Sequence, residues 1–397
     1  MGTQQVLIGN PLLMRQTNAR TLLGLVKKLG ACSRTELRLQ TGMSMTTIVN
    51  VVDDLIRLDL LESIGAGASS GGRRPDMLQF KAGHAWITGF DVGHDSLRAV
   101  LTDLNGTTLA EECRALTPEH RTPEAVVKQI AVLLRALEQR SGQKREKLLA
   151  LTVGVQGITD PAEGMVVNVS SLKNWRDIPL RKMLAEYVSA EIFIENDSNL
   201  AAIGEHFEGA AKDNDNFIFI IIGSGLGAGI FLNGQVYRGA DGTAGEIGYL
   251  HIPHIPSIRP SLYDFGRLEK VLAGPGILKS WNTAVQKDSG KPRLRHPGDV
   301  LDLALEGNSL AKKIVQQRAI LLKDVILNIS LILNPSLFVL GGEVGAHPAL
   351  LEPTASLLVE SEFAIARLTP SKLGGSAVVT GAIAVGLKYA NDILPRF

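Results

Sequence analysis

Three glycine-rich turns in this sequence are suited to holding an anionic group. Each is expected to follow a strand, and their residues are Asp91-Val-Gly93, Gly223 to Gly229 and Gly341-Gly342. Glycine in such a turn lets backbone N–H groups approach a phosphate or another anion closely. Glycine turns also serve tight strand packing, so a single one would be weak evidence. Three of them favour an anion-binding architecture, although the sequence contains no Walker lysine motif and no Rossmann fingerprint.

A second group of residues is suited to contact with DNA. Ser44 can cap a helix that runs to Leu58, and the residues expected to face outward near its start are Met45, Thr46, Thr47 and Asn50. Arg73 and Arg74 follow a glycine-rich stretch between two short expected strands. Side chains at the start of a recognition helix reach base edges, and paired arginines on a wing enter the minor groove or clamp phosphates.

The elements that must position these residues occupy residues 1–82. Apolar spacing predicts a first helix from Asn18 to Leu29, and Ser33 with Glu36 forms a capping box for a second helix that stops at Gly42. The order of helix, turn, helix and basic hairpin predicts a winged helix-turn-helix domain. The alternative is an ordinary three-helix appendage with a surface loop.

Composition and charge are those of an ordinary globular protein. The 397 residues carry a net charge of +1, but residues 1–82 hold ten Lys/Arg and six Asp/Glu, so this end is basic and the rest is slightly acidic. We expect no membrane span and no signal peptide, because no long apolar run is present. Cys32 and Cys113 are too few for a disulfide framework or a cysteine zinc site, which predicts a cytoplasmic protein.

From residue 83 onward, strand patterns alternate with helix patterns, which predicts an α/β protein. Trp86 to Gly93 and Leu97 to Gly106 are expected to form a hairpin that closes at Asn105-Gly106. Further strands are expected at Leu148 to Val155, Phe217 to Ile222 and Leu337 to Leu340. We therefore expect two α/β lobes after the N-terminal domain, over residues 83–200 and 201–397.

Four segments resemble the ROK family of repressors, open reading frames and sugar kinases, in its repressor branch. These segments are the wing GGRRPDMLQF, then GVQGITDPAEGMV, ENDSNLAAIGE and AGEIGY. The resemblance covers nearly the whole chain. It implies a two-lobed actin-like, sugar-kinase-like fold of the ribonuclease H-like type after the winged helix-turn-helix.

The resemblance also implies a sugar site. Asp197 matches the general base of the family kinases, and a carboxylate there can bind sugar hydroxyls without phosphoryl transfer. Asn196 stands beside it, while Glu246 and Glu269 match the family's sugar-binding glutamates. The alternatives are that Asn196-Asp197-Ser198 only caps the following helix and that each glutamate is a solvated carboxylate.

Three departures from the family pattern bear on the ligands that the protein can bind. Tyr249 stands where a zinc-ligating His is usual, and the segment 260–267 lacks the family's cysteines; His251 and His254 are interpreted as loop residues, so no metal is expected. Ser171 stands where a sugar-binding Asn is usual. His94 and Asp95 replace a glycine and a threonine of the first phosphate turn. An added carboxylate repels polyphosphate in a poorly hydrated site, so we expect no ATP and no catalytic residue.

These features predict a repressor with operator DNA and a small carbohydrate effector as partners, acting as a homodimer or a dimer of dimers. The effector is expected in the cleft between the lobes. One alternative is an ATP-dependent sugar kinase with an appended DNA-binding domain, in which Asp197 would be catalytic. Another is a DNA-binding scaffold whose sensor binds no ligand.

Overall fold

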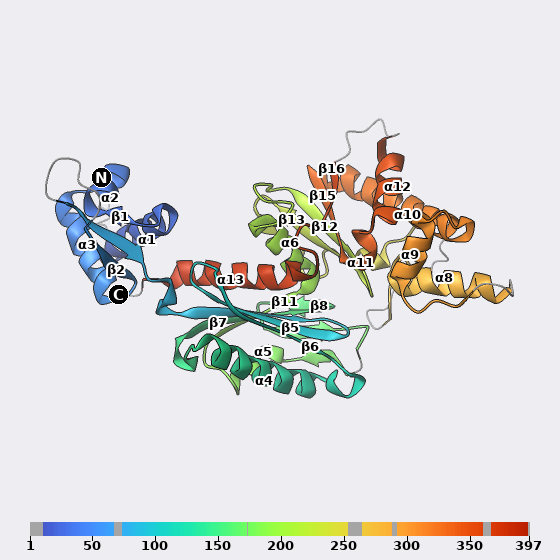
Figure 1. The fold of residues 1–397 in the computed structure, drawn as a ribbon, viewed down its shortest axis with the longest axis horizontal. Helices are drawn as coiled ribbons and strands as arrows, with labels where there is room; N and C mark the ends of the chain where they lie inside the picture. The colour runs from blue at the N-terminus through green and yellow to red at the C-terminus, as the bar shows by residue number, and fades with distance from the viewer. Residues whose placement is uncertain are drawn as a thin grey trace, which may run out of the picture.

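The structure is a computed structural model that describes residues 11–66, 74–172, 174–252, 264–287, 292–359 and 367–395. Its N-terminal part packs three helices against an antiparallel sheet with strand order β1-β3-β2 (Figure 1). The bounds are α1 (Pro11–Leu29), β1 (Cys32–Ser33), α2 (Arg34–Thr41), α3 (Met45–Arg57), β2 (Leu61–Ala66) and β3 (Asp76–Phe80). The predicted winged helix-turn-helix is confirmed over the described residues.

Side chains at the helix ends explain the boundaries of α2 and α3. Ser33 Oγ accepts a hydrogen bond from Glu36 N at 3.2 Å, and the Glu36 carboxylate accepts one from Ser33 N at 2.7 Å. Gly42 ends α2 with a φ of 69°, a left-handed conformation that glycine adopts without strain. Ser44 Oγ accepts from Thr47 N at 3.1 Å and caps α3. Each of these caps was predicted from the sequence.

The first helix begins earlier than the apolar pattern predicts. It starts at Pro11 rather than at Asn18, and proline is favoured in the first turn because its missing N–H has no partner there. Leu13 and Met14 on this added stretch are exposed. A helix segment that buries no apolar face has no periodic signature in the sequence.

The first α/β lobe is built on a five-stranded sheet of order β11-β7-β4-β5-β6. Strands β4, β7 and β11 are parallel, and β5 and β6 add antiparallel. One face packs on helices α4 and α5 through side chains such as Trp86, Phe90 and Leu134. The bounds are β4 (Trp86–Val92), β5 (Ser96–Asp103), β6 (Thr108–Ala115), α4 (Pro123–Ser141), β7 (Leu148–Val155), α5 (Leu180–Ala185) and β11 (Glu191–Asn196).

One predicted turn lies elsewhere. Asn105-Gly106 joins β5 to β6, whereas β4 and β5 are joined by the residues between Val92 and Ser96. Gly106 has a φ of 83° and its N–H donates to the Asp103 carbonyl, which is the local geometry a tight turn requires. The Asn-Gly pair therefore marked a real turn but was assigned to the wrong pair of strands.

The second lobe holds another five-stranded sheet, of order β14-β13-β12-β15-β16. Helix α6 packs on one face, and helices α7 to α10 and α12 share an apolar core with the other. The bounds are α6 (Asp197–Phe207), β12 (Phe217–Ile222), β13 (Leu226–Leu232), β14 (Gln235–Val236), α7 (Glu269–Leu272), α8 (Gly274–Lys287), α9 (Pro297–Leu305), α10 (Ser309–Leu333), β15 (Leu337–Gly341), α11 (Gly342–Gly345), α12 (Pro348–Val359) and β16 (Arg367–Pro370).

The last helix, α13 (Ala377–Ile393), returns from the second lobe and packs on β4 and β7 of the first sheet (Figure 1).

A small sheet of order β10-β9-β8 lies beside the first lobe; its bounds are β8 (Ile158–Asp160), β9 (Met165–Asn168) and β10 (Arg176–Ile178). The domain limits at residues 82 and 200 stay predictions. Within the described ranges, no helix is long and apolar enough to cross a membrane.

Candidate functional site

The carboxyl ends of three parallel strands bring Asp91 and Asp197 into one region. Asp91 on β4 pairs in register with Gly154 on β7, and Gly154 pairs in register with Glu195 on β11. The two outer strands of this trio, β4 and β11, therefore end at the same level on either side of β7. Asp197 opens α6 directly after β11. Ligand sites of open α/β sheets lie at such strand ends. Asp91 entered the sequence analysis only as part of a glycine turn, and its position at a strand end was the available signal for a site carboxylate.

Burial perturbs both of these carboxyl groups. It raises the pKa of Asp197 to about 6, although hydrogen bonds from Ser198 N at 2.8 Å and Ser198 Oγ at 3.3 Å oppose that rise. Burial also raises the pKa of Asp91 to about 7, and the charge on Asp197 adds to this effect while Arg98 opposes it. Two neighbouring carboxyl groups that resist ionisation are typical of a functional site.

Glu246 and Glu269 join the same electrostatic cluster from the second lobe. Burial raises the pKa of Glu246 to about 7, and the charges on Glu269 and Asp197 contribute further. Burial raises the pKa of Glu269 as well. We call Asp91, Asp197, Glu246 and Glu269 the carboxylate cluster. Of the sugar-site residues predicted from sequence, the structure brings together Asp197, Glu246 and Glu269.

Glu269 has a structural task within this cluster. Its Oε1 accepts from Leu226 N at 3.1 Å, and its Oε2 accepts from Gly266 N at 3.2 Å. Both oxygens therefore fix backbone at the start of β13 and ahead of α7. Glu269 is not the solvated carboxylate of the alternative interpretation, and any ligand must share its oxygens with these amides.

Asn196 has the capping role that the sequence offered as an alternative. Its Oδ1 accepts from Asn199 N at 3.0 Å, and its Nδ2 donates to the Gly157 carbonyl at 2.8 Å. Each of these atoms retains some hydrogen-bonding capacity, because a carbonyl oxygen has two lone pairs and an NH₂ group has two hydrogens. Contact between Asn196 and a sugar stays a prediction.

Tyr249 is a site residue whose contacts no local pattern in the sequence predicts. Its hydroxyl donates to the Asp264 carbonyl at 2.6 Å, and a hydrogen bond with the Ser170 side chain opposes the rise in the Tyr249 pKa that burial causes. This phenol ties together two loops that flank the carboxylate cluster. Ser171 lies in one of these loops, where its Oγ donates to Gln156 Oε1 at 3.5 Å. The sequence signal for this role of Tyr249 was that the family's His is replaced there by a side chain that carries a hydroxyl group.

Two glycines of the Gly223 to Gly229 segment, Gly227 and Gly229, have a packing explanation, whereas a Cβ on Gly223 would meet no atom within 4 Å. A Cβ on Gly227 would lie 2.6 Å from Ser198 Oγ, and one on Gly229 would lie 2.3 Å from the Ser198 carbonyl oxygen. Gly342 has a φ of 80°, and a Cβ there would lie 2.4 Å from the Ile222 carbonyl oxygen. Gly227 and Gly229 let β13 approach α6 closely, and Gly342 lets the start of α11 approach β12. At these three positions the structure favours the packing role that the sequence left open as an alternative to phosphate binding.

Asp95 lies in a more hydrated position than the sequence indicated, so it repels polyphosphate less strongly than expected. The Asp95 side chain is 75% exposed, and its Oδ1 pairs with Arg121 Nη2 at 2.5 Å. Water and an arginine thus screen a charge that was assumed to lie in a poorly hydrated site.

Among the described residues no group of three His, Cys, Asp or Glu side chains is placed to hold a metal ion. His254 lies outside the described residues.

The predicted DNA-contacting residues of the recognition helix lie at the N-terminal cap and in the first turns of α3. Met45, Thr46 and Asn50 are exposed, and Ser44 is exposed at the cap. Thr47 is half-buried, and its Oγ1 lies 2.8 Å from Ser44 Oγ, so it supports the cap as well as facing outward. Arg74 is exposed where β3 begins, while Arg73 lies outside the described residues.

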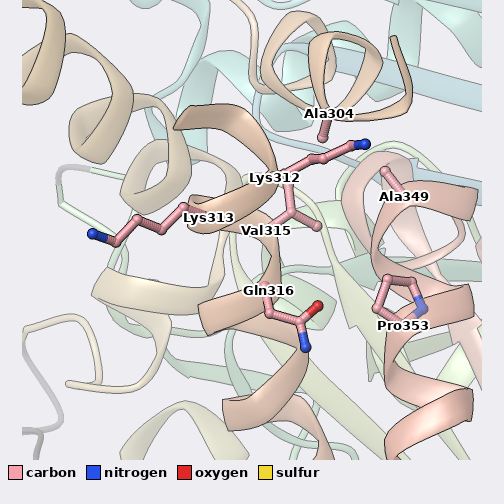
Figure 2. Close-up of a pocket in the computed structure, with 7 residues that line it drawn as sticks. All are labelled: Ala304, Lys312, Lys313, Val315, Gln316, Ala349 and Pro353. Atoms are coloured by element: carbon pink, nitrogen blue, oxygen red, sulfur yellow. The ribbon is translucent and has the colours of Figure 1, made fainter. Parts of the chain in front are cut away.

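A separate cavity of about 420 Å³ lies among α9, α10 and α12 (Figure 2). Lys312 extends across it, whereas Lys313 points away from it. Its lining residues are Ala304, Lys312, Lys313, Val315, Gln316, Ala349 and Pro353. The lining contains no carboxylate and shares no residue with the carboxylate cluster, so this cavity is distinct from the candidate site.

A family model describes most of the chain. Residues 87–388 match the model of the ROK family. The chain belongs to the ROK family. The xylose repressor of Bacillus spizizenii is 30% identical over 392 residues, which cover 98% of this chain and 99% of the relative. The DNA-binding transcriptional dual regulator NagC of Escherichia coli is 26% identical over 366 residues, which cover 90% of this chain and 88% of the relative.

Solved structures of ROK proteins share the fold. A ROK family transcriptional regulator homologous to the E. coli MLC protein aligns over 95% of this chain and 98% of its own, with a TM-score of 0.74 and 22% identity. A ROK family glucokinase from Streptomyces griseus, in complex with glucose and AMPPNP, aligns over 76% of this chain and 99% of its own, with a TM-score of 0.64 and 23% identity. The predicted family and two-lobed sugar-kinase-like fold are confirmed.

Proposed function

We propose that this ROK protein is a sugar-responsive repressor that binds operator DNA in the cytoplasm. The observation that carries the proposal is the presence, in one chain, of a recognition helix with exposed polar residues and a cluster of perturbed carboxylates at the sheet ends. Relatives that align along nearly the whole chain are named as repressors, and the first is named for xylose.

The proposed sugar site uses hydrogen bonds rather than charge. Asp197, Glu246 and Asn196 accept from or donate to ring hydroxyls, with Glu269 and Ser171 at its margin. Carboxylates accept strongly when ionised and donate one hydrogen when protonated. Because their pKa values lie near neutrality, Asp91, Asp197 and Glu246 supply both kinds of partner to neighbouring hydroxyls. Closure of the cleft on the sugar then changes the affinity for the operator.

The proposed DNA contact follows the usual division between bases and phosphates. Met45, Thr46 and Asn50 reach base edges in the major groove, with Ser44 and Thr47 at the helix start, and Arg73 and Arg74 hold the wing to the backbone. The repressor acts as a homodimer or a dimer of dimers, so a palindromic operator follows from its symmetry.

A gel shift on the DNA upstream of the protein's own gene tests the proposal. The panel contains D-xylose, N-acetylglucosamine, D-glucose and their phosphates, at a fixed moderate salt concentration. We expect a specific complex that one of these sugars releases. Asp197→Asn should bind the operator normally but resist release, and Asp213→Asn, in an exposed turn between α6 and β12, is the matched control. Failure to form any specific complex would remove the repressor function.

The second candidate function is an ATP-dependent sugar kinase with an appended DNA-binding domain. The paired Asp91 and Asp197 carboxyl groups favour it, and the hydration of Asp95 removes part of the argument against ATP. We propose that the protein needs neither ATP nor zinc and that no residue is catalytic. A coupled ATP assay with the same sugars tests this, and turnover that Asp197→Asn abolishes would establish the kinase.

A further inference from the structure

Helix α13 lies between the candidate sugar site and the winged helix-turn-helix. One end meets α6 and the other reaches the N-terminal domain, across the face of the first sheet opposite α4 (Figure 1). Its 17 residues span about 25 Å at the rise of an α-helix. Helix α13 packs against α6 and also contributes residues to the buried apolar cluster that contains residues of α1.

The contact between α13 and α6 is backbone against backbone. A Cβ on Gly381 would lie 1.8 Å from the Leu200 carbonyl oxygen, and a Cβ on Gly204 would lie 2.3 Å from the Ala377 carbonyl oxygen. Packing this close has no side-chain layer that can rearrange, so the two helices move together. Helix α6 begins at Asp197, a member of the carboxylate cluster, and a displacement there therefore reaches α13.

The other end of α13 shares a buried apolar cluster with the N-terminal domain. Leu387, Ala390 and Leu394 belong to the same buried apolar cluster as Leu22 and Val26 of α1. Ile87 and Ala150 of the first sheet are part of this cluster too. The winged helix-turn-helix is thus docked on the first lobe through a shared core.

A polar contact marks the outer edge of this dock. Lys27 Nζ of α1 donates to Asn391 Oδ1 of α13 at 2.8 Å, and it lies 4.2 Å from the centroid of the Phe80 ring. Burial lowers the pKa of Lys27 to about 8, against the opposing charge of Asp103. The ammonium group is therefore partly removed from water where α1, β3 and α13 meet.

We propose that α13 transmits sugar binding at α6 to the DNA-binding domain, and that the dock around Lys27, Leu387 and Asn391 is the joint through which it acts. This inference rests on the proposed function. Cleft closure moves α6 and α13 as one body, and the dock carries the recognition helices with them. A flexible tether would transmit no such motion.

Loosening the dock tests the proposal. The first variant combines Lys27→Ala with Asn391→Ala, and the second adds Leu387→Ala. The matched control combines Lys28→Ala with Asp392→Ala, the exposed neighbours of the same two positions. Operator Kd is measured with and without saturating D-xylose and, separately, N-acetylglucosamine, and each sugar Kd is measured by calorimetry.

We expect the loosened variants to keep two values within about twofold of the unmodified protein: the sugar Kd, and the operator Kd measured without sugar. The ratio of the operator Kd with sugar to the operator Kd without sugar should fall by about threefold or more. The control should behave as the unmodified protein. An unchanged ratio in the variant that carries all three substitutions would overturn the proposal.

A second measurement needs no sugar. Scanning calorimetry should show the N-terminal domain of the unmodified protein unfolding together with the first lobe, and the loosened variants should show a separate earlier transition. Separate unfolding in the unmodified protein would contradict the dock itself. If both sugars fail to release the operator, the choice of effector fails, while calorimetry still decides whether the dock exists.

Discussion

At the residue scale, the carboxylate cluster is a site that costs stability. Burial keeps Asp91, Asp197 and Glu246 from ionising as readily as carboxyl groups in water, and the charges of neighbouring carboxylates add to this effect at Asp91 and Glu246. A raised pKa means that the folded chain holds a proton more tightly than the unfolded chain does. As pH rises from the unfolded pKa through the folded pKa, this contribution to stability is lost.

Glu246→Gln should therefore stabilise the protein at neutral pH. The folded pKa of Glu246 is about 7 against an ordinary value of 4.5, so the glutamate loses stability between these pH values and glutamine does not. We expect a gain of about 1–2 kcal/mol at pH 7.5 that disappears near pH 4.5. Thermal unfolding at both pH values measures it. Glu163→Gln, in an exposed turn, is the control, and a gain of equal size at both pH values would refute the explanation.

Arg74→Ala should weaken operator binding through one lost phosphate contact. Arg74 is exposed where the wing strand β3 begins. We expect the slope of log Kd against log salt concentration to decrease by about one, with sugar affinity unchanged. Arg135→Ala, an exposed arginine on α4, serves as the control. Binding assays at several salt concentrations measure both, and an unaltered slope would remove Arg74 from the interface.

At the element scale, α6 links several parts of the site. Asn196 caps it, Asp197 opens it, and its body packs against β13 on one side and α13 on another. The sequence marks this role weakly, because small residues such as Ser198 and Gly204 have no distinctive pattern. Close packing of the two helices depends on the missing side chain at Gly204.

Two glycine-to-alanine substitutions should therefore have opposite effects. A Cβ on Gly204 would clash with the Ala377 carbonyl, whereas a Cβ on Gly24 of α1 would meet no atom within 4 Å. We expect Gly204→Ala to destabilise by about 2 kcal/mol or more. Gly24→Ala should stabilise by about 0.5–1 kcal/mol because alanine favours the helix. Denaturant unfolding of both variants measures this, and a stabilised Gly204→Ala would contradict the α6–α13 packing.

At the scale of the whole molecule, the basic N-terminal domain and the two α/β lobes act together only if the DNA-binding domains are held in fixed positions. The shared core around α13 holds one domain on its own first lobe. In the proposed dimer, twofold symmetry would then fix the spacing between two operator half-sites.

Changing the spacing of the half-sites tests this arrangement. Inserting about 5 base pairs between them turns one half-site to the opposite face of the DNA, so affinity should fall to that of a single half-site. Inserting about 10 base pairs restores the face and should recover part of the affinity. Gel shifts on the three operators measure the effect. Equal affinity for all three would show that the DNA-binding domains are not held at a fixed spacing.

The sequence by itself determined the local features of this protein. Ser33 with Glu36, Gly42 and Ser44 predicted the helix ends, because capping depends on residues three or four positions apart. Apolar spacing predicted the main strands, and family motifs predicted Asp197, Glu246 and Glu269 as one site. The structure brings those carboxylates together, and their contact with sugar stays a prediction.

Only the tertiary structure decided the rest, because it depends on residues far apart in the chain. Asp91 became a partner of Asp197 when parallel strands brought their ends together, and Asp95 was screened by Arg121 from another segment. Tyr249 acquired two loop contacts that no local pattern encodes. The docking of α13 on α1 joins residues more than 360 positions apart, through Lys27 and Asn391. Local capping and spacing can be read along the chain, whereas such contacts exist only after folding.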